Sequence, residues 1–169
     1  TSGGVLATGT SALNIAQLKS SGTTPLFIQV APGTTLNMNG AINAVSSYIN
    51  KTQEGTLVFN APTYGSTYVL HAGTVVLNGG SNTLYSGASV LLEQGATLDL
   101  NGNAQYVSQF TSYGSSLPGS GGSLISSGGS GLLALSGVST FGGIVSGSVS
   151  LVALSNALVL ESAQAYTGP

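Results

Sequence analysis

The sequence predicts an all-β fold in which short parallel strands stack as a β-helix, or β-solenoid, with about 18–22 residues per coil. Three observations support this prediction. A strand-like segment recurs along the chain, 26 glycines are spread over its length, and 41 % of the residues are apolar while only 4 % are charged. Recurrent glycines allow a turn every few residues, and the apolar residues suffice for a continuous core.

The recurring segment consists of a turn glycine, a short apolar-rich strand, and then Asn or Ser, often followed by Gly. Its copies are GTTLNMNG (33–40), GTLVFNA (55–61), GTVVLNG (73–79), GATLDLNG (95–102) and GLLALSG (131–137), with a degenerate copy, ALVLES, at 157–162. The first four copies begin 22, 18 and 22 residues apart, and the next gap is 36, so a copy without the signature is expected around GSLIS (122–126). This step is too short for a βαβ unit, which needs about 30 residues, and it predicts seven or eight solenoid coils.

Apolar and polar residues alternate within these segments, as expected for strands with one buried face. In GATLDLNG, Leu98 and Leu100 are predicted to face the core and Asp99 to face outward. In GTTLNMNG, Leu36 and Met38 are predicted to face inward.

The predicted domain organisation is one continuous solenoid over residues 33–169, preceded by an N-terminal cap or irregular first coil over 1–32. Within the latter, SALNIAQLKSSG (11–22) fits either a short helix or an alternating strand. The serine-rich segment 111–131 resembles a linker in composition, but its position between two repeat copies predicts loops and a narrow coil of the same domain. The uncharged segment 143–160 is long enough to cross a membrane, yet its alternation and its polar residues argue against a span.

The charge content restricts the possible partners. The charged residues are Lys19, Lys51, Glu54, Glu93, Asp99 and Glu161. Two lysines and a net charge of −2 cannot provide a phosphate-binding surface, so nucleic acid is not an expected partner. A nearly uncharged surface has little electrostatic repulsion between copies, which favours self-association. The chain has no cysteine, which excludes a thiolate metal site, and no cofactor is expected.

The order of the repeats resembles a known family. In residues 54–80, GTLVF (55–59) is followed by TYGSTYV (63–69) and AGTVVLNGG (72–80), and SNTLYSGASVLLEQGATLDLNGNAQYV (81–107) repeats that order. Residues 120–152 look like the stretch that commonly follows such copies, and AQAYTGP (163–169) looks like the opening of another. This pattern resembles the autotransporter-associated β-strand repeat over residues 54–169, more weakly over 33–53, and not before. The resemblance implies an extracellular passenger of bacterial type V secretion, which is a right-handed parallel β-helix.

Few residues are candidates for chemistry. His71 is the only histidine, and one histidine without cysteine cannot assemble a usual metal site, so we predict a structural role at a corner rather than a general base. Glu93 and Asp99 form the best carboxylate pair, but hydrolysis needs two carboxyl groups at a defined distance, and the sequence does not indicate one. Glu54 precedes Gly55 much as Gln94 precedes Gly95, which suggests a recurring corner position.

Tyrosines and threonines are candidates for surface contacts. Threonines such as those in GTSA, GTT and GAT could form a column along the rod, as in ice-binding solenoids, but their spacing is irregular and β-propensity explains them. The tyrosines Tyr48, Tyr64, Tyr68, Tyr85, Tyr106 and Tyr113 could line a sugar-binding face or could cover turns. Of these, Tyr64, Tyr68 and Tyr85 are the predicted glycan-contacting residues.

The sequence therefore predicts an extracellular structural and adhesive module that associates with itself into a surface layer or fibre. A glycan-binding adhesin is the alternative, with cell-surface glycans as partners. A polysaccharide-degrading enzyme built on a β-helix is the third possibility, and we do not expect an enzyme.

Overall fold

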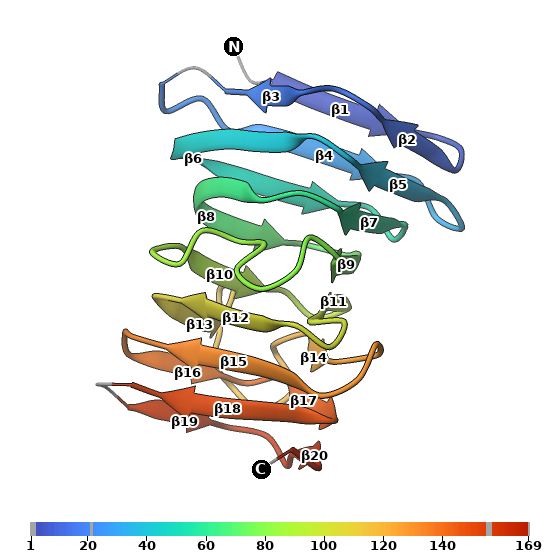
Figure 1. Ribbon diagram of the computed structural model, residues 1–169. Helices are drawn as coiled ribbons and strands as arrows, with labels where there is room; N and C mark the ends of the chain where they lie inside the picture. Colours follow the sequence, from blue (N-terminus) through green and yellow to red (C-terminus); the bar gives the residue numbers. More distant parts are fainter. Residues whose placement is uncertain (1–2, 21, 155–156, 169) are drawn as a thin grey trace.

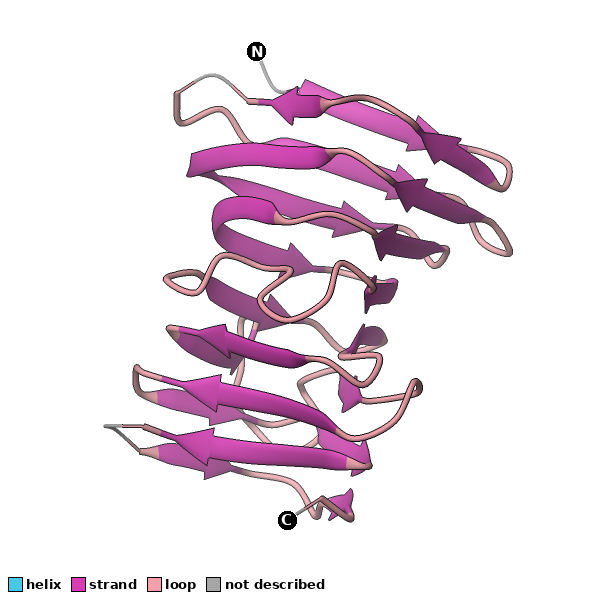
Figure 2. Cartoon of the chain, in the orientation of Figure 1, coloured by secondary structure: helices cyan, strands magenta, loops and turns pink. Residues whose placement is uncertain are grey.

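The computed structural model describes residues 3–20, 22–154 and 157–168. In these residues the regular secondary structure is β-strand throughout, without a helix (Figure 2). The strands pair in parallel and stack as a β-solenoid of about eight turns of roughly 21 residues. The turns follow one another in sequence order from the N-terminal to the C-terminal end of the rod (Figure 1). The all-β solenoid predicted from the repeats is thus confirmed.

Each turn contributes to three rows of paired strands, which we call the first, second and third ladders. The first ladder contains β1 (Gly3–Ala7), β4 (Leu26–Val30), β6 (Ala41–Thr52), β8 (Thr63–Leu70), β10 (Ser89–Leu92) and β13 (Gln109–Ser112). The second contains β2 (Ser11–Leu13), β5 (Thr35–Met38), β7 (Thr56–Phe59), β9 (Gly73–Leu77), β11 (Ala96–Asp99), β14 (Ser123–Ile125), β17 (Ile144–Gly147) and β20 (Ala165–Tyr166).

The third ladder uses strands that bend around a corner. β6 and β8 are long enough to serve both the third and the first ladder, with a register shift between Ala44 and Tyr48 where β6 turns. This ladder contains β3 (Gln17–Lys19), the first residues of β6 and β8, an isolated bridge between Thr63 and Leu84, and then β12 (Ala104–Val107), β15 (Gly131–Leu135) and β18 (Val149–Ala153). A further pair, β16 (Ser139–Phe141) with β19 (Leu158–Leu160), follows β13 in the stack.

The core consists of columns in which each coil places an apolar side chain against the equivalent one in the next coil. One such column in the second ladder is at most 3 % exposed and contains Leu36, Leu57, Val75, Leu98, Leu124 and Val145. Burying a side chain of this size contributes about 1.5–3 kcal/mol. A single coil could not bury such residues, so the stacking of coils provides the core.

The asparagines that end the repeated segments form a second kind of column, which we call the asparagine ladder. It contains Asn14, Asn39, Asn60, Asn78 and Asn101, one from each of five successive coils. Each amide nitrogen donates to the side-chain oxygen of the preceding member, at 2.5, 2.7, 2.6 and 3.0 Å from the N-terminal end onward. The recurring Asn therefore links coils through its side chain.

Close backbone contact explains some of the recurring glycines. A Cβ built on Gly73 would lie 2.4 Å from the carbonyl oxygen of Gly55, and Gly73 has a φ of 72°. A Cβ on Gly143 would lie 2.1 Å from the carbonyl oxygen of Gly122. At both corners only glycine allows adjacent coils to approach this closely.

The repeat assignment is partly right and partly wrong. GSLIS contains β14, which follows β11 in the second ladder, so the expected copy without the signature is confirmed. GLLALSG contains β15, which belongs to the third ladder, and ALVLES contains β19, which pairs with β16. These two segments are not further copies of the second-ladder strand. Strands of every ladder need a turn followed by alternating apolar residues, so the local pattern does not distinguish one ladder from another.

The remaining segments also contribute strands to the stack. Residues 11–20 contain β2 and β3 rather than a helix, while position 21 lies outside the described residues. Since β1 also pairs with β4, the described residues before position 33 already take part in the ladders. The serine-rich segment 111–131 contains β14 between two loops. Residues 144–154 contain β17 and β18, while positions 155–156 of the uncharged segment lie outside the described residues. In the described part of the chain, no helix is long and apolar enough to span a membrane.

Candidate functional site

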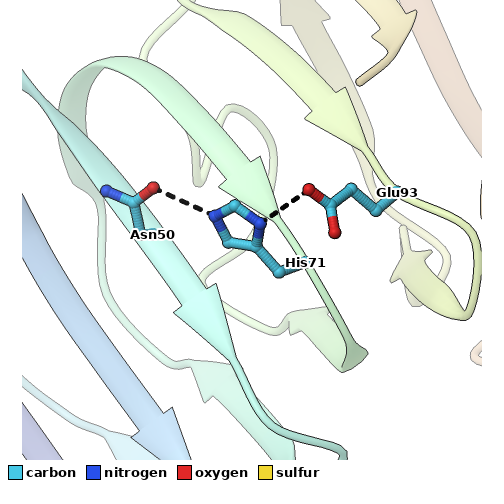
Figure 3. Close-up of polar contacts among 3 residues, drawn as sticks. All are labelled: Asn50, His71 and Glu93. Carbon is cyan, nitrogen blue, oxygen red and sulfur yellow. Dashed lines mark hydrogen bonds and ion pairs between the residues drawn. The ribbon is translucent and has the colours of Figure 1, made fainter. Parts of the chain in front are cut away.

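His71 lies at a corner where side chains from four successive coils meet. Its Nδ1 is 2.8 Å from Glu93 Oε1, and its Nε2 is 3.2 Å from Asn50 Oδ1 (Figure 3). The imidazole also contacts the ring of Tyr113 edge-on, with the centroids 5.6 Å apart. The backbone fixes this arrangement, because His71, Glu93 and Tyr113 each donate their N–H to the preceding coil.

This geometry gives His71 a linking role. A carboxylate oxygen only accepts, so Nδ1 is the ring nitrogen that donates to Glu93. The side chains of His71 and Glu93 are 28 % and 34 % exposed. Each ring nitrogen thus has a partner from an adjacent coil, which is the arrangement expected of a corner residue that connects coils.

The carboxylates belong to separate networks. Asp99 accepts hydrogen bonds from the backbone N–H groups of Asn101 and Ser127, at 2.8 and 2.9 Å, and from Ser127 Oγ at 2.5 Å. It lies in the row of Val76 and Ile125, on the opposite side of the strand from Leu98, as predicted, yet it is only 4 % exposed. The loop after β14 covers it, which the alternation within its own strand could not reveal. Glu93 is bound to His71 and Glu54 is exposed at a corner, so these bonds give no sign of a paired catalytic site. Among the described residues, no group of three or more His, Cys, Asp or Glu side chains could hold a metal ion.

Lys51 is a buried cation that the sequence analysis did not single out. It occupies a core position between Ile28 and Leu70 and is 1 % exposed. Its Nζ donates to the carbonyl oxygens of Thr52, Gln53 and Ala72, at 3.1, 2.6 and 3.0 Å. Burial lowers the pKa of Lys51 from 10.5 to about 8, because a desolvated ammonium is less stable than a hydrated one. Its place two residues after Ile49, in the same strand phase, was the signal that it faces inward.

Tyr68 cannot contact a glycan, and that prediction is wrong. Its side chain is 1 % exposed, and its hydroxyl donates to the carbonyl oxygen of Thr63 at 2.9 Å and accepts from the N–H of Gly65 at 3.0 Å. Burial raises the pKa of Tyr68, since the phenolate would be desolvated. Tyr68 lies in the first-ladder part of β8, in register with the core residues Ile49 and Val90.

The other two predicted tyrosines are exposed and lie in one column. Tyr64 and Tyr85 are 42 % and 41 % exposed, and the bridge between Thr63 and Leu84 aligns their coils. Tyr106, on β12 of the next coil, is 39 % exposed. These tyrosines are each 21 residues apart in the sequence, which is one coil, and this interval was the signal for their alignment.

The threonines also align, in contrast to the irregularity of their sequence spacing. Thr35, Thr56, Thr74 and Thr97 are direct partners along the second ladder, and Thr10 Oγ1 accepts from the N–H of Thr35 at 3.4 Å. Coils of unequal length produce unequal intervals in the sequence while the register is kept. The four threonines that are direct partners are half-buried, as expected for β-branched residues beside one another on a sheet.

Comparison with protein-family models, with curated proteins and with solved structures found no match to this chain. The function proposed below therefore rests on the geometry of the chain, and the resemblance to autotransporter-associated repeats stays a prediction.

Proposed function

We propose that this chain is an extracellular structural and adhesive module of a secreted bacterial passenger, and that it self-associates into a surface layer or fibre. The observation that carries the proposal is the continuity of the stack. Parallel ladders, buried columns and the asparagine ladder connect successive coils in register, and this produces a stiff rod.

The surface of the rod favours contact between copies. Of the six charged residues, Lys51 and Asp99 are buried, which leaves four charged side chains on a surface of 7034 Å². The remaining surface consists largely of Ser, Thr, Asn, Gln and Gly, together with exposed tyrosines and with exposed aliphatic residues such as Leu117 and Leu154. With so little charge, electrostatic repulsion between rods is weak, and hydrogen bonds and apolar contacts can hold them together.

The test is a measurement of mass against concentration. Light scattering and sedimentation velocity should show mass increasing with concentration, and electron micrographs should show bundled or elongated rods. Because few charges are involved, the association should depend weakly on sodium chloride and increase with sulfate. A chain that stays monomeric at every concentration would contradict self-association.

The extracellular location has its own test. Antibodies against the purified chain should label intact cells of the source organism, and added protease should remove the label. A label that appears only after lysis would contradict the proposed location.

A further inference from the structure

The exposed tyrosines belong to a longer column on the third ladder, which we call the tyrosine column. Lys19 pairs with Asn43, Asn43 pairs with Tyr64, and the next coils add Tyr85 and Tyr106. The column thus crosses five successive coils along the axis of the rod. Paired strands in a sheet are about 4.8 Å apart, which is the interval from Lys19 through Asn43 to Tyr64, and the bridge between Thr63 and Leu84 continues it to Tyr85. Between Tyr85 and Tyr106 the side-chain amide of Gln105 takes the place of main-chain pairing.

A buried amide keeps Tyr85 and Tyr106 in line. Gln105, which precedes Tyr106, is 1 % exposed. Its side-chain oxygen accepts from the N–H of Leu84 and its amide nitrogen donates to the carbonyl oxygen of Leu84, both at 3.0 Å. On the other side, Asn82 Oδ1 accepts from the N–H of Tyr106 at 3.0 Å. These bonds fix the two coils relative to each other, so the two tyrosines are held in place.

The ring of Tyr85 lies against the surface over Gly87. A Cβ built on Gly87 would lie 2.8 Å from Cε1, 2.9 Å from Cζ and 3.0 Å from the hydroxyl oxygen of Tyr85. Three atoms of one side chain at nearly equal distance show that the side chain lies across Gly87. The protein therefore supports one side of Tyr85, and its 41 % exposure leaves the other side to solvent.

The surroundings indicate the chemistry of a partner. In the third-ladder strands, Lys19 at one end of the column is the only charged residue among those described. The polar groups beside the tyrosines are amides, from Asn43 and Asn82. An uncharged, aromatic and amide-bearing surface suits a ligand with apolar C–H faces and hydroxyl edges, whereas a charged polymer would find no counter-charges beside the three rings.

We propose that the tyrosine column binds a neutral, extended polysaccharide of the β-linked glucan type, lying along the rod axis. The interval between coils is comparable with the length of one sugar unit in such a chain, so successive sugars can contact successive tyrosines. Sugar C–H faces stack on the exposed phenol rings, and the amides of Asn43 and Asn82 bond to hydroxyl groups. The assignment gives a partner class to the adhesive role proposed above, but it does not depend on self-association.

The experiment is native affinity electrophoresis of the whole chain in gels that contain hydroxyethyl cellulose, a soluble neutral β-glucan. The wild-type chain should be retarded, and Tyr85→Ala or Tyr106→Ala should each weaken binding roughly three- to tenfold, as expected for loss of one aromatic contact. The double variant should migrate as it does without polysaccharide.

Two further variants test whether the loss of binding is specific to the tyrosine column or follows the removal of any exposed tyrosine. Tyr48→Ala removes a tyrosine of 51 % exposure from the first ladder and should bind as the wild type does. Gly87→Ala keeps Tyr85 but lifts its ring from the surface, since the added Cβ meets ring atoms at 2.8 Å, and it should weaken binding. Circular dichroism checks that each variant is folded.

Several outcomes would overturn the proposal. They are the absence of retardation by the neutral glucan, retardation only by carboxymethyl cellulose, equal loss in Tyr48→Ala, and full binding by the double variant. Light scattering on the same variants distinguishes the two proposals. If the double variant loses glucan binding but still associates, the two surfaces are separate. If the double variant assembles to a lower mass than the wild-type chain but still binds the glucan, the column is a contact between copies and the glucan assignment fails.

Discussion

The coils up to Asn101 and the coils after it have the same fold but are connected by different side-chain contacts. In the earlier coils, like residues stack on like residues, as in the asparagine ladder and the threonine column. In the later coils, side chains complete the bonds of the main chain. Ser139 Oγ accepts from the N–H of Phe110 at 3.0 Å, and Gln164 Oε1 accepts from the N–H of Val145 at 2.6 Å.

The difference shows that regular repeats are one of two ways to stack coils. Where the repeat is strict, columns of like side chains link neighbouring coils in addition to the bonds of the main chain. Where the repeat is degenerate, serine and glutamine replace missing main-chain partners, so buried polar groups still find hydrogen bonds. The later coils also expose more apolar residues, including Val138, Ile144, Leu154 and Val159. The serine-rich segment 111–131 is thus part of the folded stack and not a linker.

The largest expected effect is at a glycine corner of the later coils. In Gly143→Ala, the new Cβ would meet the carbonyl oxygen of Gly122 at 2.1 Å and Cζ of Phe141 at 2.4 Å, so two coils would have to separate. We expect a loss of about 3 kcal/mol or more in the free energy of unfolding, measured by urea denaturation. Gly9→Ala is the control, because nothing lies within 4 Å of its added Cβ. Equal stability of the two variants would show that the close approach of coils is not required.

Lys51 interrupts an apolar column of the earlier coils, between Ile28 and Leu70, and it predicts a pH dependence. The pKa of Lys51 is about 8 in the folded chain and 10.5 ordinarily, so between these values the unfolded chain binds more protons. Stability should therefore rise with pH from about 8 toward 9.5, by roughly 1–2 kcal/mol. Thermal unfolding across this range measures the slope. In Lys51→Met the rise should disappear, and an unchanged slope would show that another group causes it.

The two ways of linking coils predict unequal costs for removing an amide. Gln164→Ala should cost about 1–3 kcal/mol, because it leaves the N–H of Val145 without its acceptor and the carbonyl oxygens of Gly143 and Ser162 without that donor. Urea denaturation of this variant beside Asn60→Ala measures the difference. If Asn60→Ala costs more, side-chain ladders rather than main-chain bonds dominate the stacking.

The asparagine ladder itself predicts a smaller effect. Asn60→Ala removes two side-chain bonds at an exposed column, to Asn39 and Asn78, and should cost about 1 kcal/mol. Asn60→Ser gives a matched control with a shorter polar side chain. Hydrogen exchange at the corner should increase in both variants, more in Asn60→Ala, and no change in either would contradict a linking role for the ladder.

The smallest expected effect is at the His71 corner. His71→Gln keeps a side chain that can reach Glu93 and should change stability by less than about 1 kcal/mol, since the site is partly exposed. His71→Ala should cost more, through loss of both bonds and of the contact with Tyr113. Thermal unfolding of the two variants measures the contribution, and a stabilised His71→Ala would contradict it.

The sequence was sufficient to predict the fold class, because the spacing between repeat copies gives the number of residues in one coil. It also located GSLIS in the second ladder, although the interval that indicated this ended at GLLALSG, which belongs to the third ladder. It could not assign GLLALSG and ALVLES to the correct ladder, because every strand of the stack has the same alternation. Lengths of the intervening loops decide which ladder a strand joins, and these loops vary after Asn101.

Prediction of the candidate site was less complete for a related reason. Tyr64 and Tyr85 were found by residue type, whereas Tyr68 was misassigned because β8 bends and its two halves face differently. Tyr106 belongs to the same column, and the 21-residue interval from Tyr85 is the signal in the sequence for it. Burial of Asp99 depends on a loop 28 residues away, through Ser127, which no local pattern records.

The asparagine ladder also has a direction. Every amide nitrogen in it points toward the N-terminal end of the rod and every amide oxygen toward the C-terminal end. Reversing one member would oppose two NH₂ groups on one side and two oxygens on the other, so the whole row must share one orientation. The aligned amides add a dipole along the axis, in the manner of the peptide units of a helix. The row ends at Asn101, where the following coil covers it, so this polarity belongs to the first five coils and only the Asn14 end of the row lies in a terminal coil of the rod.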